Sequence, residues 1–171
     1  ALQRRRHRGT GRADVAMGSP IAGRSQGGFE ANIGLFLNNL VLRGCMTNDM
    51  KFFDLLSQAR KTVVNAFSNQ DIPFEKLVDM LQPDRQLDRN PLFDVFINLY
   101  NDKASLQLDG LQVKSKFIKE IAAKFDLSCN IEKYDGKYEI RFVYKDGLFS
   151  DARMMHMLLQ YLQLLEQVTD K

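Results

Sequence analysis

The side chains best able to carry out chemistry in this sequence are two histidines and two cysteines. His7 lies within a run of arginines, and His156 lies in an apolar pattern of helical spacing without an acidic residue at a useful distance. Cys45 and Cys129 belong to no CxxC or Cys/His cluster, and the GxSxG, P-loop and HExxH patterns are absent. A general base needs an oriented partner, and a zinc site needs clustered ligands. The residues alone therefore predict two free thiols, no metal site and no evident catalytic centre.

A polar segment, SNQDIPFEKLV, separates two apolar patterns of helical spacing. It contains Asn69, Gln70, Asp71 and Pro73. Proline has a fixed φ and no N–H, so it fits the first turn of a helix, and an aspartate two residues earlier can accept hydrogen bonds from the free amides there. We interpret the segment as a turn that ends one helix and starts the next, with Asp71 as the N-cap of the second helix.

The first half of the chain is expected to alternate strands and helices. Residues 14–22 have the pattern of a buried strand that runs into a loop at residues 23–28. Residues 33–43, IGLFLNNLVLR, resemble a strand, but Asn38 and Asn39 lie at its middle and cannot be buried without partners. The other expected elements are amphipathic helices at about residues 49–68 and 73–81, a charged loop at 83–90, a strand at 92–100 and a loss of order at 101–107.

The second half of the chain favours β structure followed by one helix. Residues 111–118 alternate, and two further alternating runs flank Tyr134-Asp135-Gly136, which predicts a hairpin. Asp146-Gly147 predicts a turn and Ser150 an N-cap. The last helix carries an apolar stripe of Met154, Leu158, Leu162, Leu165 and Val168. The pattern predicts an α/β fold, a two-layer sandwich of a mixed β-sheet with helices, without an internal repeat.

Composition and charge limit the classes of protein that fit. The 171 residues are 44% hydrophobic and 26% charged, which suits one globular domain. No apolar run approaches the roughly 20 residues that span a bilayer, and the N-terminus lacks the apolar segment of a signal peptide, so we expect a cytoplasmic protein without membrane contact. Residues 1–13 form a basic segment with five arginines, and the rest of the chain has 19 basic residues against 21 acidic ones. We expect no nucleic-acid binding, because no basic face continues beyond that segment.

Six segments in order resemble one known family, the condensation domains of nonribosomal peptide synthetases. They are DVAMGSPIAGR, IGLFLNNLVLR, NQDIPFEKLV, RQLDRNPLFDVFIN, AKFDLS and YKDGLFS. The resemblance covers residues 14–171 and is to the C-terminal lobe of that domain. It departs from the family at Asn39, where Thr is usual, at Gln86, where Asp is usual, and at Asp88, where Ser is usual. In the last segment, Lys-Asp-Gly replaces the usual Asn-Thr-Asp.

The resemblance implies a fold and a reaction. The family's domain is a V-shaped pair of lobes related to chloramphenicol acetyltransferase, and this chain would be one half domain. The complete domain forms an amide bond between an upstream acyl-thioester and a downstream aminoacyl-thioester, both held on phosphopantetheine arms of carrier proteins. Its HHxxxDG motif, whose second histidine acts as the base, does not occur in these 171 residues. The implied partners are the N-terminal lobe, carrier proteins and adjacent synthetase domains, with no cofactor bound directly and no activity from this chain alone.

The resemblance also assigns roles to individual residues. Ser19, Ala22, Arg24 and Asn38 become candidates for the wall of the substrate tunnel, with the loop after the first strand as its floor. Structural alternatives stay open for three of them: a salt bridge that holds the loop for Arg24, a structural hydrogen bond for Asn38, and an equally balanced structural role for Ser19. The structural residues are those of the turn at 69–73 and the loop residues Arg85, Asp88, Arg89 and Asn90.

Two other classes of function remain open. One is a noncatalytic module that binds a carrier protein or a partner lobe. The other is a different enzyme of the same superfamily, such as an epimerisation domain or a free-standing acyltransferase. The segment IGLFLNN argues against epimerisation, because that subfamily's motif differs here.

Overall fold

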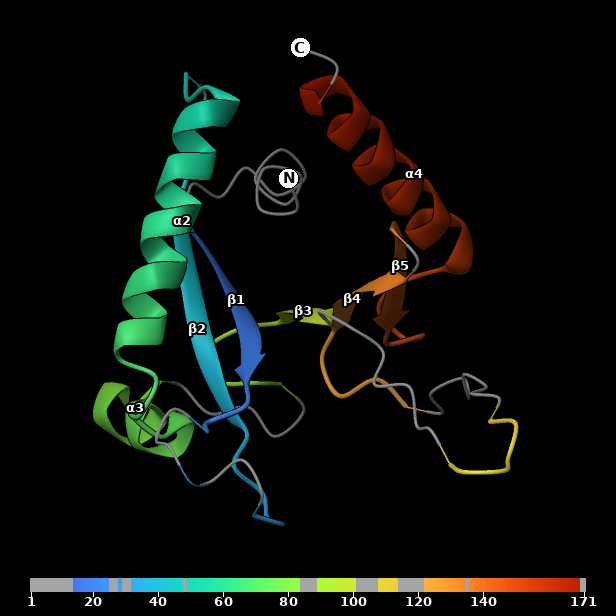
Figure 1. Ribbon diagram of the computed structural model, residues 1–171. Helices are drawn as coiled ribbons and strands as arrows, with labels where there is room; N and C mark the ends of the chain where they lie inside the picture. Colours follow the sequence, from blue (N-terminus) through green and yellow to red (C-terminus); the bar gives the residue numbers. More distant parts are fainter. Residues whose placement is uncertain are drawn as a thin grey trace.

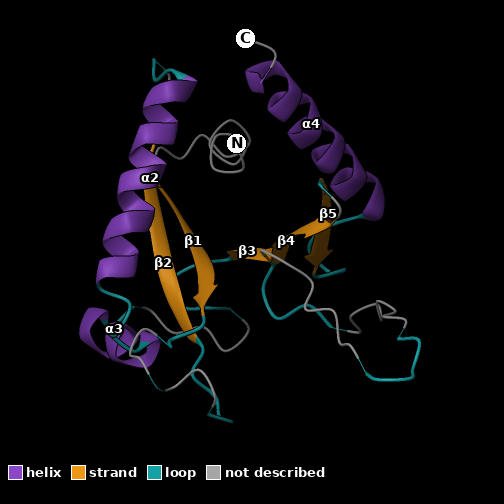
Figure 2. Cartoon of the chain, viewed as in Figure 1, coloured by secondary structure: helices purple, strands orange, loops and turns teal. Residues whose placement is uncertain are grey.

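The computed structural model describes residues 14–24, 28, 32–47, 49–83, 89–100, 108–113, 122–134 and 136–169. They form a five-stranded mixed sheet with strand order β2-β1-β3-β4-β5. Strands β1 and β2 are antiparallel, β1 and β3 parallel, β3 and β4 parallel, and β4 and β5 antiparallel. The two long helices lie beside the sheet (Figures 1 and 2). This arrangement confirms the predicted α/β fold with a mixed sheet and helices.

The first four elements run from residue 14 to residue 81. They are β1 (Asp14–Ile21), β2 (Asn38–Cys45), α2 (Phe52–Ser68) and α3 (Phe74–Leu81). Helix α2 begins three residues later than expected, since the carboxylate of Asp54 accepts a hydrogen bond from the Lys51 amide and Lys51 is the N-cap. Strand β2 begins at Asn38 instead of at residue 33. Its partner β1 ends at Ile21, opposite Asn38, and Gly23 then turns the chain away with a φ of 62°.

The remaining elements are β3 (Val95–Tyr100), β4 (Leu127–Tyr134), β5 (Lys137–Tyr144) and α4 (Asp151–Thr169). Strand β3 begins later than expected, because the side chain of Asn90 accepts hydrogen bonds from the Leu92 and Phe93 amides. The hairpin between β4 and β5 is confirmed, with Tyr134 opposite Lys137. Residues 108–113 form a bridge between Leu108 and Leu111 and not the expected strand, while 101–107 and 114–118 lie outside the described residues.

The main core lies between one face of the sheet and the two long helices. Side chains alternate along each strand, so one face carries Val15 and Met17 from β1, Val95 from β3, and Leu127 and Cys129 from β4. Leu55 of α2 and Met154 and Tyr161 of α4 pack against this face. The predicted stripe on α4 was right for Met154 and wrong for Leu162, which is exposed, whereas Tyr161 is buried. Tyr161 lies seven residues after Met154, about two helical turns, which places both side chains on the same side of α4.

The other face of the sheet carries aromatic rings beside β1 and charged side chains beside β5. Phe93, Phe96 and Phe125 contact one another, with 4.5 Å between the ring centroids of Phe96 and Phe125. Phe74 of α3 meets Phe93 edge to face at 5.8 Å. Gly18 of β1 lies directly under the ring of Phe93, where a Cβ atom would clash. Helix α3 is therefore attached to the face opposite α2 and α4.

Candidate functional site

The turn between α2 and α3, residues 69–73, is held by a side chain from β2. We call this turn the elbow. The amide of Asn38 donates hydrogen bonds to the carbonyl oxygens of Gln70 (2.9 Å) and Ile72 (2.8 Å). Its oxygen accepts hydrogen bonds from the backbone amides of Phe74 (3.0 Å) and Asn39 (2.9 Å). An asparagine side chain has two donor hydrogens and two acceptor lone pairs, so this group is fully used. The structural alternative for Asn38 is thus the one observed.

The N-terminus of α3 corrects two local predictions. Pro73 is the N-cap residue, with an extended backbone at φ −60° and ψ 140°, and the helix begins at Phe74. Asp71 lies two residues before the cap and is not the N-cap residue. The side-chain oxygen of Asn38 instead accepts the hydrogen bond of the first helical amide. A contact from 36 residues away has replaced the local cap that the sequence favoured.

The loop between β1 and β2 is closed at its base by Gly23, Arg24 and Phe36. The guanidinium carbon of Arg24 lies 4.4 Å from the centroid of the Phe36 ring, a cation–π contact. A Cβ atom at Gly23 would clash with the carbonyl oxygen of Phe36, so the two backbones approach as closely as glycine allows. Phe36 is half-buried, while its neighbours Leu35 and Leu37 are exposed.

The four tunnel candidates lie at one end of the β1–β2 pair. Ser19 is half-buried in β1 opposite Leu40 of β2, and Ala22 is exposed just beyond the strand. Arg24 follows in the loop, and Asn38 opens β2 opposite Ile21. By strand alternation, Ser19 is on the face covered by the helices. All four residues therefore lie near the same end of the β1–β2 pair. The side-chain amide of Asn38 makes its hydrogen bonds with the elbow and the start of α3.

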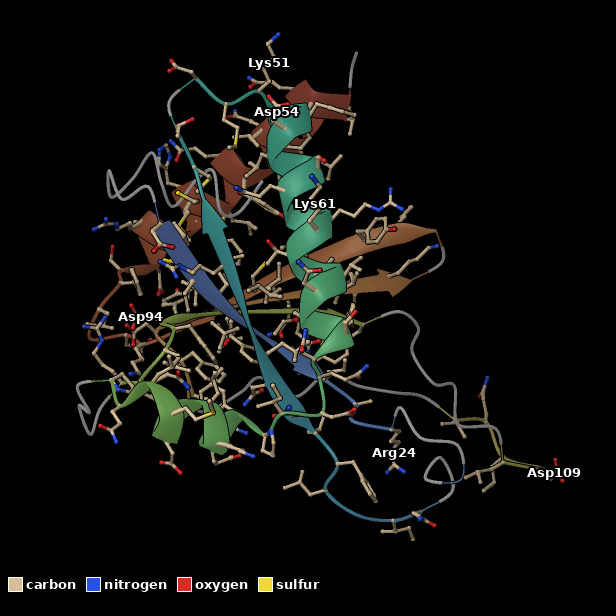
Figure 3. All side chains as sticks on the ribbon, turned by 90° about the vertical axis from the view of Figure 1, so that its left-hand side faces the viewer. Arg24, Lys51, Asp54, Lys61, Asp94 and Asp109 are labelled. Carbon is tan, nitrogen blue, oxygen red and sulfur yellow. The ribbon has the colours of Figure 1, made fainter. Side chains whose placement is uncertain are left out.

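Three of the motif segments meet at the start of β3 and β4. Arg89 lies 2.9 Å from the carboxylate of Asp94 and 3.9 Å from that of Asp126, and Lys145 lies 2.9 Å from Asp126. Two backbone hydrogen bonds, from Leu127 to Asp94 and from Lys145 to Asp126, join the same segments. Arg89 and Asn90 thus make contacts just before β3, which is where the motif was expected to hold the loop, while Arg85 and Asp88 lie outside the described residues. In Figure 3, Asp94 lies at the left of the view and Arg24 near the bottom, to the right of centre.

Sequence reasoning missed a charged group on the sheet face that α2 and α4 do not cover. Arg141 of β5 pairs with Glu132 of β4, and its Nε lies 3.3 Å from a carboxylate oxygen of Glu139. The side chains of Arg141 and Glu132 are only 20% and 15% exposed. Their positions in alternating strands signalled that they share a face, but the alternation could not indicate how far they are buried.

The thiols and the described histidine do not form a catalytic group. Both cysteines are free, as predicted, with Cys45 exposed and Cys129 buried. Burial raises the pKa of the Cys129 thiol to about 11 and that of the Tyr161 hydroxyl to about 12. His156 is exposed on α4, and its ring Nε2 lies 2.7 Å from the side-chain amide nitrogen of Gln160. Within the described ranges there is no group of three or more His, Cys, Asp or Glu side chains that could hold a metal ion.

Comparison with known proteins places the chain in a family. The family model of the condensation domain matches residues 7–171. The chain belongs to the condensation domain family. Condensation domains of nonribosomal peptide synthetases are amide-forming acyltransferases that join carrier-bound substrates. Among the described helices of this chain, none is long and apolar enough to cross a membrane.

Sequence relatives of this condensation domain chain are large synthetases. It is 36% identical over 160 residues to tyrocidine synthase 3 of Brevibacillus parabrevis. It is 33% identical over 162 residues to bacitracin synthase 3 of Bacillus licheniformis. These alignments cover 93% and 94% of this chain but span only 2% of the length of each synthetase.

Solved structures share the fold of this condensation domain chain. The X-domain from teicoplanin biosynthesis matches with a TM-score of 0.85 and 21% identity, over 96% of this chain and 38% of that one. The starter condensation domain of rhizomide synthetase matches with a TM-score of 0.74 and 19% identity, over 99% of this chain and 40% of that one. At these identities the matches establish the fold alone.

Proposed function

We propose that this chain is the C-terminal lobe of a nonribosomal peptide synthetase condensation domain and supplies one wall of its amide-forming site. The observation that carries the proposal is the coverage: nearly the whole chain aligns with 38–40% of solved chains of the same fold. The HHxxxDG motif is not among these residues. The proposed companion is therefore an N-terminal lobe with the catalytic histidine, and the proposed location is the cytoplasm.

Exposed apolar side chains of the lobe support a companion. The helices α2 and α4 cover one face of the sheet, while on the other face the described helix α3 lies beside β2, and the ion pair of Arg141 and Glu132 lies on β4 and β5. The segment at residues 108–113 projects away from the sheet in Figure 1, with Leu108, Leu111 and Val113 exposed. Exposed apolar groups in an alternating segment suit a surface that another lobe covers.

In this proposal the chain positions substrates and a separate lobe manages the proton. Condensation requires the amine of an aminoacyl-thioester to meet an acyl-thioester, each brought on a phosphopantetheine arm by a carrier protein. Holding the two groups together and excluding water are tasks for the walls of a tunnel. Ala22 and Arg24, just beyond β1, and the loop that follows are the proposed contribution of this lobe, while the side chain of Ser19 lies on the sheet face that α2 and α4 cover. Asn38 contributes indirectly, because its side-chain hydrogen bonds hold the elbow against the start of β2.

A complete domain tests the proposal. This chain would be joined in frame to an N-terminal condensation lobe with HHxxxDG and incubated with acyl-loaded and aminoacyl-loaded carrier proteins. We expect an amide product, detected by mass, that disappears when the second histidine of the motif is changed to alanine. Arg24→Ala should lower turnover, and Arg153→Ala, an exposed change on α4, should not. A folded complete domain without product would contradict the amide-forming role.

A noncatalytic binding module is the second candidate. The fold match to the X-domain favours it, because that domain was solved in a complex with OxyB from teicoplanin biosynthesis. The same fold therefore occurs in a protein that binds a partner. Titration of the complete domain with unloaded carrier proteins separates the two candidates. A stable complex without turnover of loaded carriers would favour the binding module.

A further inference from the structure

Asn38 connects two segments that are far apart in the sequence. Its side chain makes hydrogen bonds to the backbone of the elbow at Gln70, Ile72 and Phe74. Its own backbone begins β2, directly after residues 32–37 of the loop. Because every donor and acceptor of its amide is used, a shift of the elbow must either break these bonds or move the start of β2.

The loop has a second attachment two residues earlier. Phe36 lies under the guanidinium of Arg24 and against the backbone of Gly23. Ile33 and Leu35, by contrast, are almost fully exposed. The position of residues 32–37 is thus defined at Phe36 by contacts with the end of β1 and at Asn38 by contacts with the elbow.

We propose that Asn38 is a positioning residue that couples the elbow to the loop between β1 and β2. The inference rests on the proposed function, in which that loop forms part of the floor of the amide-forming site. The elbow then affects turnover without touching the substrates. It sets the direction in which the chain leaves the loop and enters β2, and the Arg24–Phe36 contact passes that setting to the end of β1.

The change Asn38→Asp tests the coupling with little change in shape. It replaces the amide nitrogen by an oxygen that faces the carbonyl oxygens of Gln70 and Ile72, so two attractive contacts become repulsive. The acceptor for the amides of Asn39 and Phe74 remains. Asn39→Thr is the matched control, because it changes the adjacent residue to the one usual in the family.

Amide hydrogen exchange on this chain gives the first readout. We expect Asn38→Asp to speed exchange at least tenfold both at Asn39, where the loop enters β2, and at Phe74, while the β4–β5 hairpin keeps its protection. Asn39→Thr should leave all three unchanged. Faster exchange in the elbow alone, or no change in either segment, would overturn the coupling. If the variant loses the hairpin protection as well, it is destabilised as a whole and cannot report on coupling. Native-state exchange of the unchanged chain in low urea then tests whether the two segments are coupled. The amides of Asn39 and Phe74 must then open together, and separate openings would refute the proposal.

Turnover of the complete domain gives the second readout. We expect Asn38→Asp to lower kcat about tenfold with an unchanged KM for the aminoacyl carrier protein, since misplacement of a wall affects the reacting geometry. Asn39→Thr should keep both values. Coupled exchange with unchanged kcat would overturn the positioning role. A complete unchanged domain that forms no amide would instead refute the proposed function, and the exchange experiment would still decide whether the two segments are coupled.

Discussion

At the scale of single residues, Gly18 determines how closely the aromatic cluster packs on the sheet. The ring of Phe93 occupies the place that a side chain of residue 18 would need. Phe93 in turn contacts Phe74 of α3 and the rings of Phe96 and Phe125. One missing Cβ atom therefore allows α3 to be attached to the sheet through a continuous set of rings.

We predict that Gly18→Ala destabilises the chain by about 1–3 kcal/mol, because an overpacked core must shift rings or backbone. Gly147→Ala is the control, since a Cβ atom there would meet no neighbour within 4 Å. Urea unfolding of both variants measures the difference. Equal stability of the two variants would mean that Phe93 moves aside at no cost.

The buried thiol of Cys129 predicts a loss of stability at alkaline pH. Its pKa is about 11 in the folded chain against an ordinary 9.0, because burial disfavours the thiolate. Between these values the unfolded chain releases the thiol proton and the folded chain keeps it. The free energy of unfolding therefore falls as pH rises, by on the order of 2 kcal/mol across that window. The raised pKa of Tyr161 adds a further fall at higher pH.

Unfolding measured from pH 8 to pH 11 checks this prediction. Cys129→Ala should flatten the decline between pH 9 and pH 11, while Cys45→Ala, at an exposed position, should leave it unchanged. The same slope in all three proteins would show that Cys129 does not titrate in this window.

At the scale of elements, α4 shows where a local signal is sufficient. Ser150 precedes the helix, and its hydroxyl accepts a hydrogen bond of 3.4 Å from the Arg153 amide. The bond is long, so we expect Ser150→Ala to cost about 0.5–1 kcal/mol, at the lower end of the usual range. Ser57→Ala, an exposed position within α2, should be neutral or slightly stabilising, because alanine favours helix. Thermal unfolding compares the melting temperatures of the two variants. A Ser150→Ala variant as stable as Ser57→Ala would contradict the role of Ser150 as the N-cap of α4.

Elements whose ends are set locally could be predicted, and elements whose ends are set by distant contacts could not. The β4–β5 hairpin follows from alternation around Asp135-Gly136, and α4 follows from its cap and apolar spacing. Strand β2 begins at Asn38 because β1 ends opposite it, which no property of residues 33–37 indicates. The family resemblance identified the fold, but the alternation of residues 111–118 gave no sign that 108–113 would lie apart from the sheet.

The candidate site shows the same division between local and distant causes. The motif segments singled out Asn38, the elbow and the loop at Arg89 and Asn90 as candidates for the substrate tunnel or for structural roles. Sequence spacing could not indicate that Asn38 bonds to the elbow, because the partners are 32 to 36 residues away. The sequence favoured Asp71 as the cap, whereas the N-cap residue is Pro73 and the first helical amide donates its hydrogen bond to Asn38.

At the scale of the whole molecule, the two faces of the sheet differ in what covers them. Leu55, Met154 and Tyr161 from the helices pack on one face. The other face has α3 and the rings beside β1, and the charges of Arg141, Glu132 and Glu139 beside β5. Buried ion pairs add little stability by themselves, but removing one partner is costly. The two faces therefore rely on different interactions, apolar packing beneath the helices on one and aromatic rings with ion pairs on the other.

The last prediction is that this chain alone folds but forms no amide bonds. Folding is expected because the mixed sheet and its two long helices share one core, so a single cooperative unfolding transition should be seen.

The expected inactivity of the chain has a separate cause. A positioned base typically contributes about 10²- to 10⁴-fold, and orientation of two thioesters requires both walls of the site. The chain would be incubated with acyl-loaded and aminoacyl-loaded carrier proteins, and the product measured by mass against a control without protein. Product above that control, and its loss in Arg24→Ala, would show that this lobe manages the proton itself and would contradict the division of labour between the two lobes.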